Sequence, residues 1–439
     1  MLDPSFTHPN SKEDLFTGTD LIRERLLDLN DFLWLETGNC KGASPSRFPV
    51  LAGLEMNQKL EINTIDELPL LQRFVEENKG QWIFGHFTYE SRFLLEPSLS
   101  TFLVPEGNFA PISFFVPRFV WNPSVYGNSV WVQDENRTIS PGELLSRLAK
   151  NDSNVSEEMC FEEKTLLTEE GYNAALEKIF GHLHRGDIYE MNYCIPFMAQ
   201  GNMPDPVNVW KKMQLKQQAP FGALYRRNHN WLLCSSPERW LMKSGNTLIS
   251  QPIKGTARRA NDPQTDQAIK QSLLQSEKEK AENVMIVDLV RNDLGRIAVT
   301  GSVKVDELFG IYSFPNVHQM ISTISAQLDT SAGFNDILHA LFPMGSMTGA
   351  PKISAMEIIR KTEVFNRGLY SGSVGYIDPE GNFDFNVVIR SILYNEKTGS
   401  ALFPAGSAIT VHCDPKAEYH ECLLKSNSMR SALELPLSD

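Results

Sequence analysis

Two pairs of glutamates have the spacing expected of a cation site. Glu279 and Glu282 are three residues apart in one expected helix, and Glu418 and Glu421 are three residues apart in another. Because residues three apart lie on the same face of a helix, two such helices could direct four carboxylates to one point. A site of oxygen ligands, completed by water and substrate, suits Mg²⁺. The spacing therefore predicts a magnesium site.

Each glutamate pair also has an ordinary structural interpretation. Glu279 follows Ser276 by three residues, as in a capping box. Glu418 falls in the first turn of a helix expected to begin at Asp414-Pro415, where a negative charge is favourable. Spacing alone does not choose between these interpretations and metal binding.

A lysine beside a glycine turn could supply a nucleophile. Lys254 follows an expected strand at residues 246–250 and precedes Gly255. A lysine amine becomes nucleophilic when burial lowers its pKa. Lys254 is therefore a candidate for covalent catalysis.

An acidic residue in a turn could act as a proton donor. Glu238 lies in Ser235-Ser236-Pro237-Glu238-Arg239, between two expected strands. Its carboxyl group could serve as a general acid. It could equally form a surface ion pair with Arg239, which is the simpler interpretation.

Three further features could bind an anionic group. The loop Gly345–Lys352 leads into a helix whose first position can be Pro351, and free N–H groups there could hold a carboxylate or phosphate. The same loop could also be only a tight turn with a helix cap. Arg390, at the end of an apolar, strand-like run, could bind a carboxylate in a bidentate way or close an ion pair. His318, in another strand-like stretch, is either a site residue or a buried, hydrogen-bonded histidine.

The elements that must position these side chains include both strands and helices. We expect strands at residues 32–35, 82–85 and 112–116, and a strand-like segment at 188–199. A helix is expected to begin after Thr168, which can cap it, and to end at Gly186. Further helices are expected at about residues 276–294 and near Pro351 and Pro415. Strands between helices, some of them in hairpin-like pairs, predict a mixed α+β fold.

A polar segment at about residues 140–163 divides the chain. It contains Asn151-Asp152-Ser153-Asn154, a typical loop composition. A chain of 439 residues is long enough for one large domain and a smaller one. We therefore predict a β-rich N-terminal region at residues 1–160 and a second domain at residues 165–435.

Composition limits the partners of the chain. Its formal net charge of −13 argues against nucleic acid or an anionic membrane as the main partner. The sequence has no apolar run long enough to span a membrane and no evident signal peptide. The six cysteines include no Cys-x-x-Cys pair and are expected to be reduced thiols in the cytoplasm.

Several motifs, taken in order, resemble those of the chorismate-utilising enzymes. They cover roughly residues 165 to 433 and are Pro252–Thr256, Ala281–Arg296, Gly349–Lys352, Gly375-Tyr376 and Val388–Ser391. The resemblance implies that residues 165–435 form a chorismate-binding catalytic domain. It also implies a fold of antiparallel β-sheets packed face to face and flanked by helices.

Two positions separate the subtypes of this family. Pro-Ile-Lys-Gly-Thr at Lys254 is similar to the large subunits of aminodeoxychorismate synthases, whereas anthranilate synthases have alanine in place of the lysine. The isochorismate and salicylate synthases carry a lysine that activates water at the position of Glu190. The amidating subunits usually have glutamine there, so Glu190 is a departure. The resemblance therefore implies amination of chorismate rather than attack by water.

The implied reaction uses chorismate and ammonia and serves the 4-aminobenzoate branch of folate synthesis. Lys254 would attack C2, Glu238 would protonate the departing C4 hydroxyl, and ammonia would displace the lysine at C4. Alternatively, Lys254 supplies only positive charge and ammonia adds directly. Mg²⁺ on the four glutamates would bind the ring carboxylate. The chain has no glutaminase segment, so a separate glutamine amidotransferase subunit is the implied source of ammonia.

The resemblance also implies a set of substrate-binding residues. They are Gly255, Thr256, His318, Ser346, Tyr376, Arg390, Gly406 and Lys425. One position departs, because Ala408 stands where the family has a second glycine in its Ala-Gly-x-Gly loop. Two alternatives stay open: anthranilate synthase component I, and a homologue that binds chorismate but has lost activity.

Overall fold

The computed structural model describes residues 12–38, 46–99, 108–148 and 158–438. Within these residues, 19 strands form one antiparallel network and three more form a small separate sheet. The strands of the large sheet are β1 (Asp31–Glu36), β2 (Val50–Ile62), β3 (Ile83–Phe87), β4 (Ile112–Trp121), β5 (Val130–Val132), β6 (Arg137–Ile139), β7 (Cys160–Thr165), β9 (Phe197–Asn202), β10 (Phe221–Arg227), β11 (Asn230–Ser236), β12 (Arg239–Ser244), β13 (Thr247–Gln251), β14 (Ile253–Arg258), β15 (Lys304–Ser313), β16 (Val317–Gln327), β18 (Ser373–Ile377), β19 (Phe383–Asn386), β20 (Ser391–Asn395) and β21 (Ser400–Leu402). Those of the small sheet are β8 (Glu190–Ile195), β17 (Gly349–Ala350) and β22 (Ala405–Thr410), with β8 in the middle.

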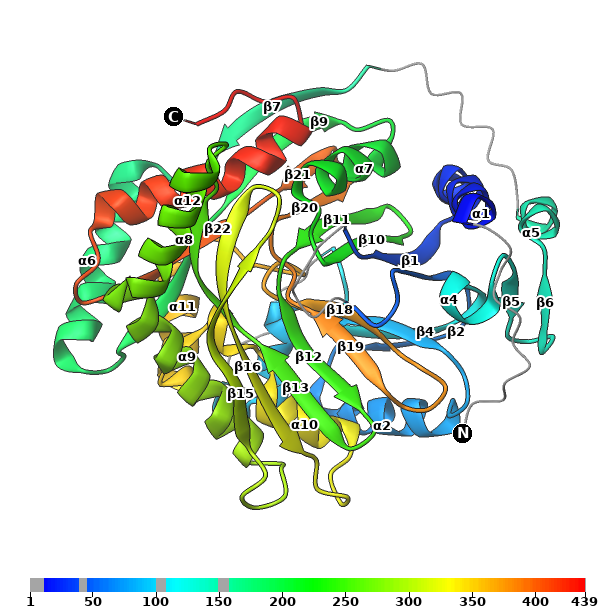
Figure 1. Ribbon diagram of the computed structural model, residues 1–439, viewed down its shortest axis with the longest axis horizontal. Helices are drawn as coiled ribbons and strands as arrows, with labels where there is room; N and C mark the ends of the chain where they lie inside the picture. Colours follow the sequence, from blue (N-terminus) through cyan, green and yellow to red (C-terminus); the bar gives the residue numbers. More distant parts are fainter. Residues whose placement is uncertain (1–11, 39–45, 100–107, 149–157, 439) are drawn as a thin grey trace.

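The helices gather mainly at the rim of the sheets. They are α1 (Lys12–Glu24), α2 (Leu68–Glu77), α3 (Arg92–Leu95), α4 (Pro123–Tyr126), α5 (Pro141–Arg147), α6 (Glu169–Arg185), α7 (Pro206–Gln217), α8 (Pro263–Gln275), α9 (Glu277–Gly295), α10 (Phe334–Leu341), α11 (Lys352–Thr362) and α12 (Pro415–Ala432). Figure 1 shows α6, α8, α9, α11 and α12 together on one side of the strands, with α1, α4 and α5 at the opposite end. Among the residues that the structure describes, no helix is both long enough and apolar enough to cross a membrane.

Strands from the beginning and the end of the chain are hydrogen-bonded to one another. β1 pairs with β10 as well as with β2, and β3 pairs with β18. Strands from residues 1–160 and from residues 165–435 therefore share one sheet. The segment Asn151–Asn154, where we place the boundary, lies outside the described residues, and the division into two domains stays a prediction.

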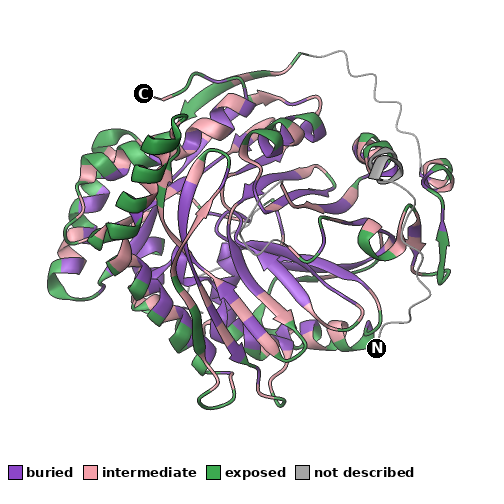
Figure 2. Ribbon diagram, in the orientation of Figure 1, coloured by how far each residue is buried: buried purple, intermediate pink, exposed green. Residues whose placement is uncertain are grey.

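The central strands of the large sheet are buried on both faces, whereas edge strands such as β7 are largely exposed. Alternation along β1 directs Leu33 into one hydrophobic core, and Phe32 and Trp34 into another. Figure 2 shows the buried strands at the centre and the exposed helix surfaces outside. This arrangement confirms the predicted α+β fold of packed antiparallel strands with flanking helices.

Local signals located the helix ends well. The Thr168 hydroxyl accepts a hydrogen bond from the Gly171 N–H at the start of α6, and Gly186 ends that helix in the left-handed conformation. The expected segment 188–199 is in fact two strands. Pro196 lies between them, and it divides β8 in the small sheet from β9 in the large one.

Candidate active site

Lys254 lies on β14 at an irregular point of the sheet. The pairing of β14 with β16 shifts register between Ile253 and Thr256, and Gly255 has a φ of +90°. The Lys254 side chain is 11% exposed, and its Nζ donates to Glu190 Oε1 at 2.6 Å. Glu190 belongs to β8, so this ion pair joins the large sheet to the small one.

The charge state of Lys254 differs from the expectation drawn from burial alone. Burial acts to lower the pKa of Lys254, but the nearby carboxylates, with Glu190 the strongest, outweigh it, and the pKa is raised. The net shift of the Lys254 pKa is therefore opposite to the one that burial alone would produce. Lys254 is an ammonium group in this arrangement.

Glu238 is buried and hydrogen-bonded to a residue far away in the sequence. The Ser346 hydroxyl donates to Glu238 Oε1 at 2.7 Å. Burial raises the pKa of Glu238 to about 7, although the Ser346 hydrogen bond and the charge of Lys254 act to lower it. A carboxyl group with this pKa can hold a proton near neutrality and release it.

The alternative interpretation of Glu238 as half of a surface ion pair is wrong. Arg239 pairs with Asp384 instead, through contacts of 2.8 and 3.0 Å within the core. The turn before β12 buries Glu238 because it packs against the loop that carries Ser346. That loop is a short 3-10 turn, η5 (Gly345–Met347), followed by β17 and by α11, for which Pro351 is the N-cap.

The four predicted metal-binding glutamates lie on two neighbouring helices, α9 and α12. Lys278 Nζ lies 3.3 Å from Glu418 and 3.8 Å from Glu282, so carboxylates from both helices converge on this one ammonium group. Burial raises the pKa of Glu282 to about 7 and also raises those of Glu279 and Glu418.

The fourth glutamate is held by a different lysine. Lys425 Nζ lies 2.5 Å from Glu421, and its charge lowers the pKa of Glu421 although burial acts to raise it. The acids also act on one another, because the charge of Glu421 raises the pKa values of Glu279 and Glu418. Among the described residues, no three acidic, histidine or cysteine side chains are already arranged as a metal site.

Three of the predicted substrate-binding residues meet at α12 and β22. Lys425 donates to the Gly406 carbonyl at 2.9 Å, and Arg390 Nη1 donates to the Lys425 carbonyl at 3.2 Å. We expected Arg390 to end a strand, but it does not. It lies in a bend between β19 and β20 with a φ of +51°.

Gly255 connects the lysine strand to the acidic helices. A Cβ at Gly255 would stand 3.1 Å from Glu279 Oε2, so the glycine allows β14 to approach α9 closely. Thr256 follows it, exposed, and pairs with Gln319 of β16. The neighbouring His318 is buried, and both ring nitrogens have protein partners, Ser313 at 2.8 Å and Asp266 at 3.0 Å.

Tyr376 is not brought together with the other candidates. Its ring packs against Phe48 and Trp82, and it lines a small pocket between N-terminal residues and β10. Tyr370, which the sequence analysis did not single out, lies near Arg390 instead. Burial lowers the pKa of Arg390, and the charge of Tyr370 acts in the opposite direction. No short-range pattern distinguished one buried tyrosine from the other.

Two other residues of the site were not predicted as such. Lys278 lies between Glu282 and Glu418, and its position on the face of Glu282 was visible from their spacing of four. Glu190 was noticed only as a departure from the family pattern. Its contact with Lys254 spans 64 residues of sequence, which no local signal predicts.

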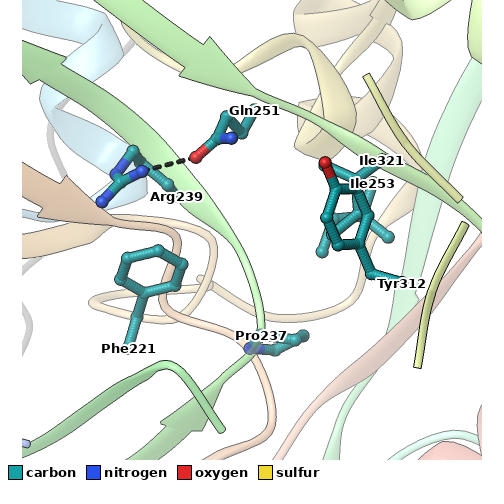
Figure 3. Close-up of a pocket in the computed structure, with 7 residues that line it drawn as sticks. All are labelled: Phe221, Pro237, Arg239, Gln251, Ile253, Tyr312 and Ile321. Atoms are coloured by element: carbon teal, nitrogen blue, oxygen red, sulfur yellow. Dashed lines mark hydrogen bonds between the residues drawn. The ribbon is translucent and has the colours of Figure 1, made fainter. Parts of the chain in front are cut away.

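A second small pocket lies beside the residues next to Glu238 and Lys254. It is drawn in Figure 3. Pro237 and Arg239 flank Glu238, and Ile253 precedes Lys254, so the pocket is lined by the neighbours of the two catalytic candidates. Figure 3 also shows the hydrogen bond from Arg239 to Gln251 that closes one side.

Comparison with known proteins identifies the family. The family described as chorismate binding enzyme matches residues 32–431, which is most of the chain. Component 1 of aminodeoxychorismate synthase from Salmonella typhimurium is 41% identical over 263 residues, and the protein of the same name from Bacillus subtilis is 37% identical over 268. These matches include 60% and 61% of this chain, but only 57% and 56% of the length of those relatives.

Solved structures show the same fold at low sequence identity. The menaquinone-specific isochorismate synthase of Escherichia coli gives a TM-score of 0.71 at 16% identity, covering 92% of this chain and 88% of that one. Anthranilate synthase component I of Streptococcus pneumoniae gives 0.67 at 20% identity, covering 99% and 95%. The chain belongs to the family of chorismate binding enzymes.

Proposed function

We propose that this chain aminates chorismate at C4 and forms 4-amino-4-deoxychorismate, as component I of an aminodeoxychorismate synthase. The observation that carries the proposal is the buried Lys254, in Pro-Ile-Lys-Gly-Thr, with its amine among the carboxylates of Glu190, Glu238 and Glu282. The similarity to proteins named aminodeoxychorismate synthase component 1 supports it.

The chemistry requires a donor for a poor leaving group. Glu238, with a pKa of about 7, would give its proton to the C4 hydroxyl, which then departs as water. The Lys254 amine would form a bond to C2 as the C4–O bond breaks. Ammonia would then attack C4 and release the lysine, so that two displacements replace one difficult step.

Magnesium fits the chemistry of the acidic helices. Glu279, Glu282, Glu418 and Glu421 offer only oxygen donors, and their shared burial and mutual repulsion favour a cation between α9 and α12. When bound, Mg²⁺ would neutralise the ring carboxylate of chorismate and act as a Lewis acid. Lys278, whose ammonium group lies between Glu282 and Glu418, would turn away from the bound ion.

The remaining roles in this proposal follow from charge and position. Arg390 and Lys425, which meet at α12, would bind the substrate carboxylates, with Gly406 beside them. Ammonia would come from a separate glutamine amidotransferase subunit. The five described cysteines are free thiols, which supports a role in the cytoplasm.

A product assay tests the proposal. The purified chain is incubated with chorismate, Mg²⁺ and an ammonium salt. The products are separated by liquid chromatography and identified by mass spectrometry. We expect 4-amino-4-deoxychorismate, which an added lyase converts to 4-aminobenzoate. Fluorescent anthranilate formed without a lyase would contradict the proposal. A folded chain that binds chorismate but does not convert it would also contradict the proposal.

A further inference from the structure

We propose that Glu190 accepts the proton of Lys254 before the lysine attacks the substrate. The inference rests on the proposed function, because it concerns the lysine of that same reaction. Glu190 would not touch the substrate and would act through Lys254. It would therefore be a positioning and proton-accepting residue whose identity matters for the rate.

The geometry of the pair suits direct proton transfer. Glu190 Oε1 lies 2.6 Å from Lys254 Nζ, and the Glu190 side chain is 2% exposed. The second carboxylate oxygen, Oε2, is buried and has no hydrogen-bond partner among the described residues. The regular pairing of β8 with β22, in which Glu190 faces Thr410, holds the backbone of this carboxylate in place.

A protonated lysine has no lone pair and cannot form the carbon–nitrogen bond. The structure stabilises that protonated form, because three carboxylates from three different elements raise the pKa of Lys254. They are Glu190 on β8, Glu282 on α9 and Glu238 before β12. In this chain, where Glu190 is the carboxylate that raises this pKa most, the lysine needs a base within the site to remove its proton.

The other charged groups around Lys254 are not available as this base, because each has another role or another partner. Glu238 must carry a proton for the leaving hydroxyl, and Glu282 is one of the proposed magnesium ligands. On α8 and β16, Asp266 and His318 are hydrogen-bonded to each other. Glu421 of α12 is paired with Lys425. Glu190 is the carboxylate in hydrogen-bond contact with the lysine.

The protons balance through a full cycle. In the first step Lys254 gives a proton to Glu190, its lone pair forms the bond to C2, and the C4–O bond breaks as Glu238 gives its proton to the departing hydroxyl. The lysine is then a secondary ammonium group. In the second step ammonia attacks C4, and the C2–N bond electrons return to Lys254. Glu190 gives its proton back to the lysine, and Glu238 takes the surplus proton of the new amine.

The test measures bond formation at Lys254 directly. Without ammonia, chorismate and Mg²⁺ should leave an adduct with the mass of chorismate less one water, detected on the acid-quenched intact protein. Glu190→Gln keeps the size of the side chain but removes the base. Glu282 and Glu238 still act to raise the pKa of Lys254 in this variant, so the lysine still needs a base. We expect its adduct to form about 100-fold more slowly at neutral pH, the usual contribution of a general base. The rate should rise with pH as solvent base takes over.

Two further variants separate proton transfer from a structural effect. Glu190→Asp keeps a carboxylate and should recover part of the rate at neutral pH. Glu396→Gln makes the same change in a remote ion pair with Arg226, and should form the adduct at the wild-type rate. Thermal unfolding of each variant checks that the fold is retained.

The possible outcomes are distinguishable. If wild type forms the adduct and Glu190→Gln forms it as fast at every pH, the role of Glu190 is overturned while the proposed function stands. If wild type makes the aminated product but no adduct, the covalent route is wrong, and the inference falls with it. If wild type makes no aminated product at all, the proposed function itself fails.

Discussion

Ser346 and Glu238, 108 residues apart in the chain, share a 2.7 Å hydrogen bond within the buried site. The serine hydroxyl donates, so it stabilises the ionised carboxylate, whereas burial stabilises the protonated one. Their balance gives Glu238 a pKa of about 7. A proton donor tuned by one neighbouring hydroxyl should respond to the loss of that hydroxyl.

Ser346→Ala should move the alkaline limb of the pH profile upward. Glu238 acts in its protonated form, so activity is present at low pH and is lost as pH rises through about 7. Removing the donor raises the pKa of Glu238 further, and the activity should persist to higher pH. The measurement is kcat against pH at a fixed concentration of free ammonia. Glu238→Gln should lack this limb and lose about 100-fold in kcat. An unmoved limb in Ser346→Ala would remove the serine from the tuning of Glu238.

Lys254→Ala should destabilise the protein as well as inactivate it. It leaves Glu190 as an unpaired buried charge, and breaking one side of a buried pair costs about 3 kcal/mol or more. Adding Glu190→Gln should recover most of the free energy of unfolding but none of the activity. Urea denaturation of wild type, both single variants and the double variant measures this coupling. Additive losses of stability would show that the ion pair contributes little.

Lys278→Met should strengthen magnesium binding. The Lys278 ammonium group neutralises Glu282 and Glu418, so its removal leaves carboxylates that a divalent cation can compensate. We expect a several-fold lower dissociation constant for Mg²⁺ by calorimetric titration. Lys280→Met, on the same helix but paired with Glu277, is the matched control and should bind as wild type does. Equal affinity in all three proteins would show that Lys278 does not compete with the ion.

Arg390→Met should weaken substrate binding more than turnover. A charge-assisted hydrogen bond to a carboxylate contributes ~1.5–3 kcal/mol, so KM for chorismate should rise about tenfold or more with little change in kcat. Arg291→Met removes an exposed arginine that pairs with Asp288 on α9 and should leave both constants unchanged. A fall in kcat alone would place Arg390 outside carboxylate binding.

The part of the structure that sequence predicted is the part decided by short-range physics. Thr168 and Gly186 bounded a helix correctly because caps depend on neighbours a few residues away. The partners of Glu238 and Arg239 could not be predicted, because Ser346 and Asp384 are more than a hundred residues distant. Short-range reasoning therefore favoured an ion pair between the adjacent residues Glu238 and Arg239, and that alternative is wrong.

The position of Lys254 was predicted from a motif, but its charge state was not. The sign of its pKa shift depends on Glu190, which comes from the other sheet, and on Glu282 from a helix. The same limit applies to Tyr376, because its ring packs against Phe48, a residue more than three hundred positions away in the sequence. Resemblance selected the residues of the candidate site, and their three-dimensional neighbours determine its electrostatics.

The pairing of β3 with β18 has a consequence for folding during translation. Residues Ile83–Phe87 cannot complete their hydrogen bonds until Ser373–Ile377 have left the ribosome. During most of translation the apolar strand β3 therefore has an unpaired edge, which favours aggregation. Such distant contacts make folding slow, so this chain should depend on chaperones during synthesis.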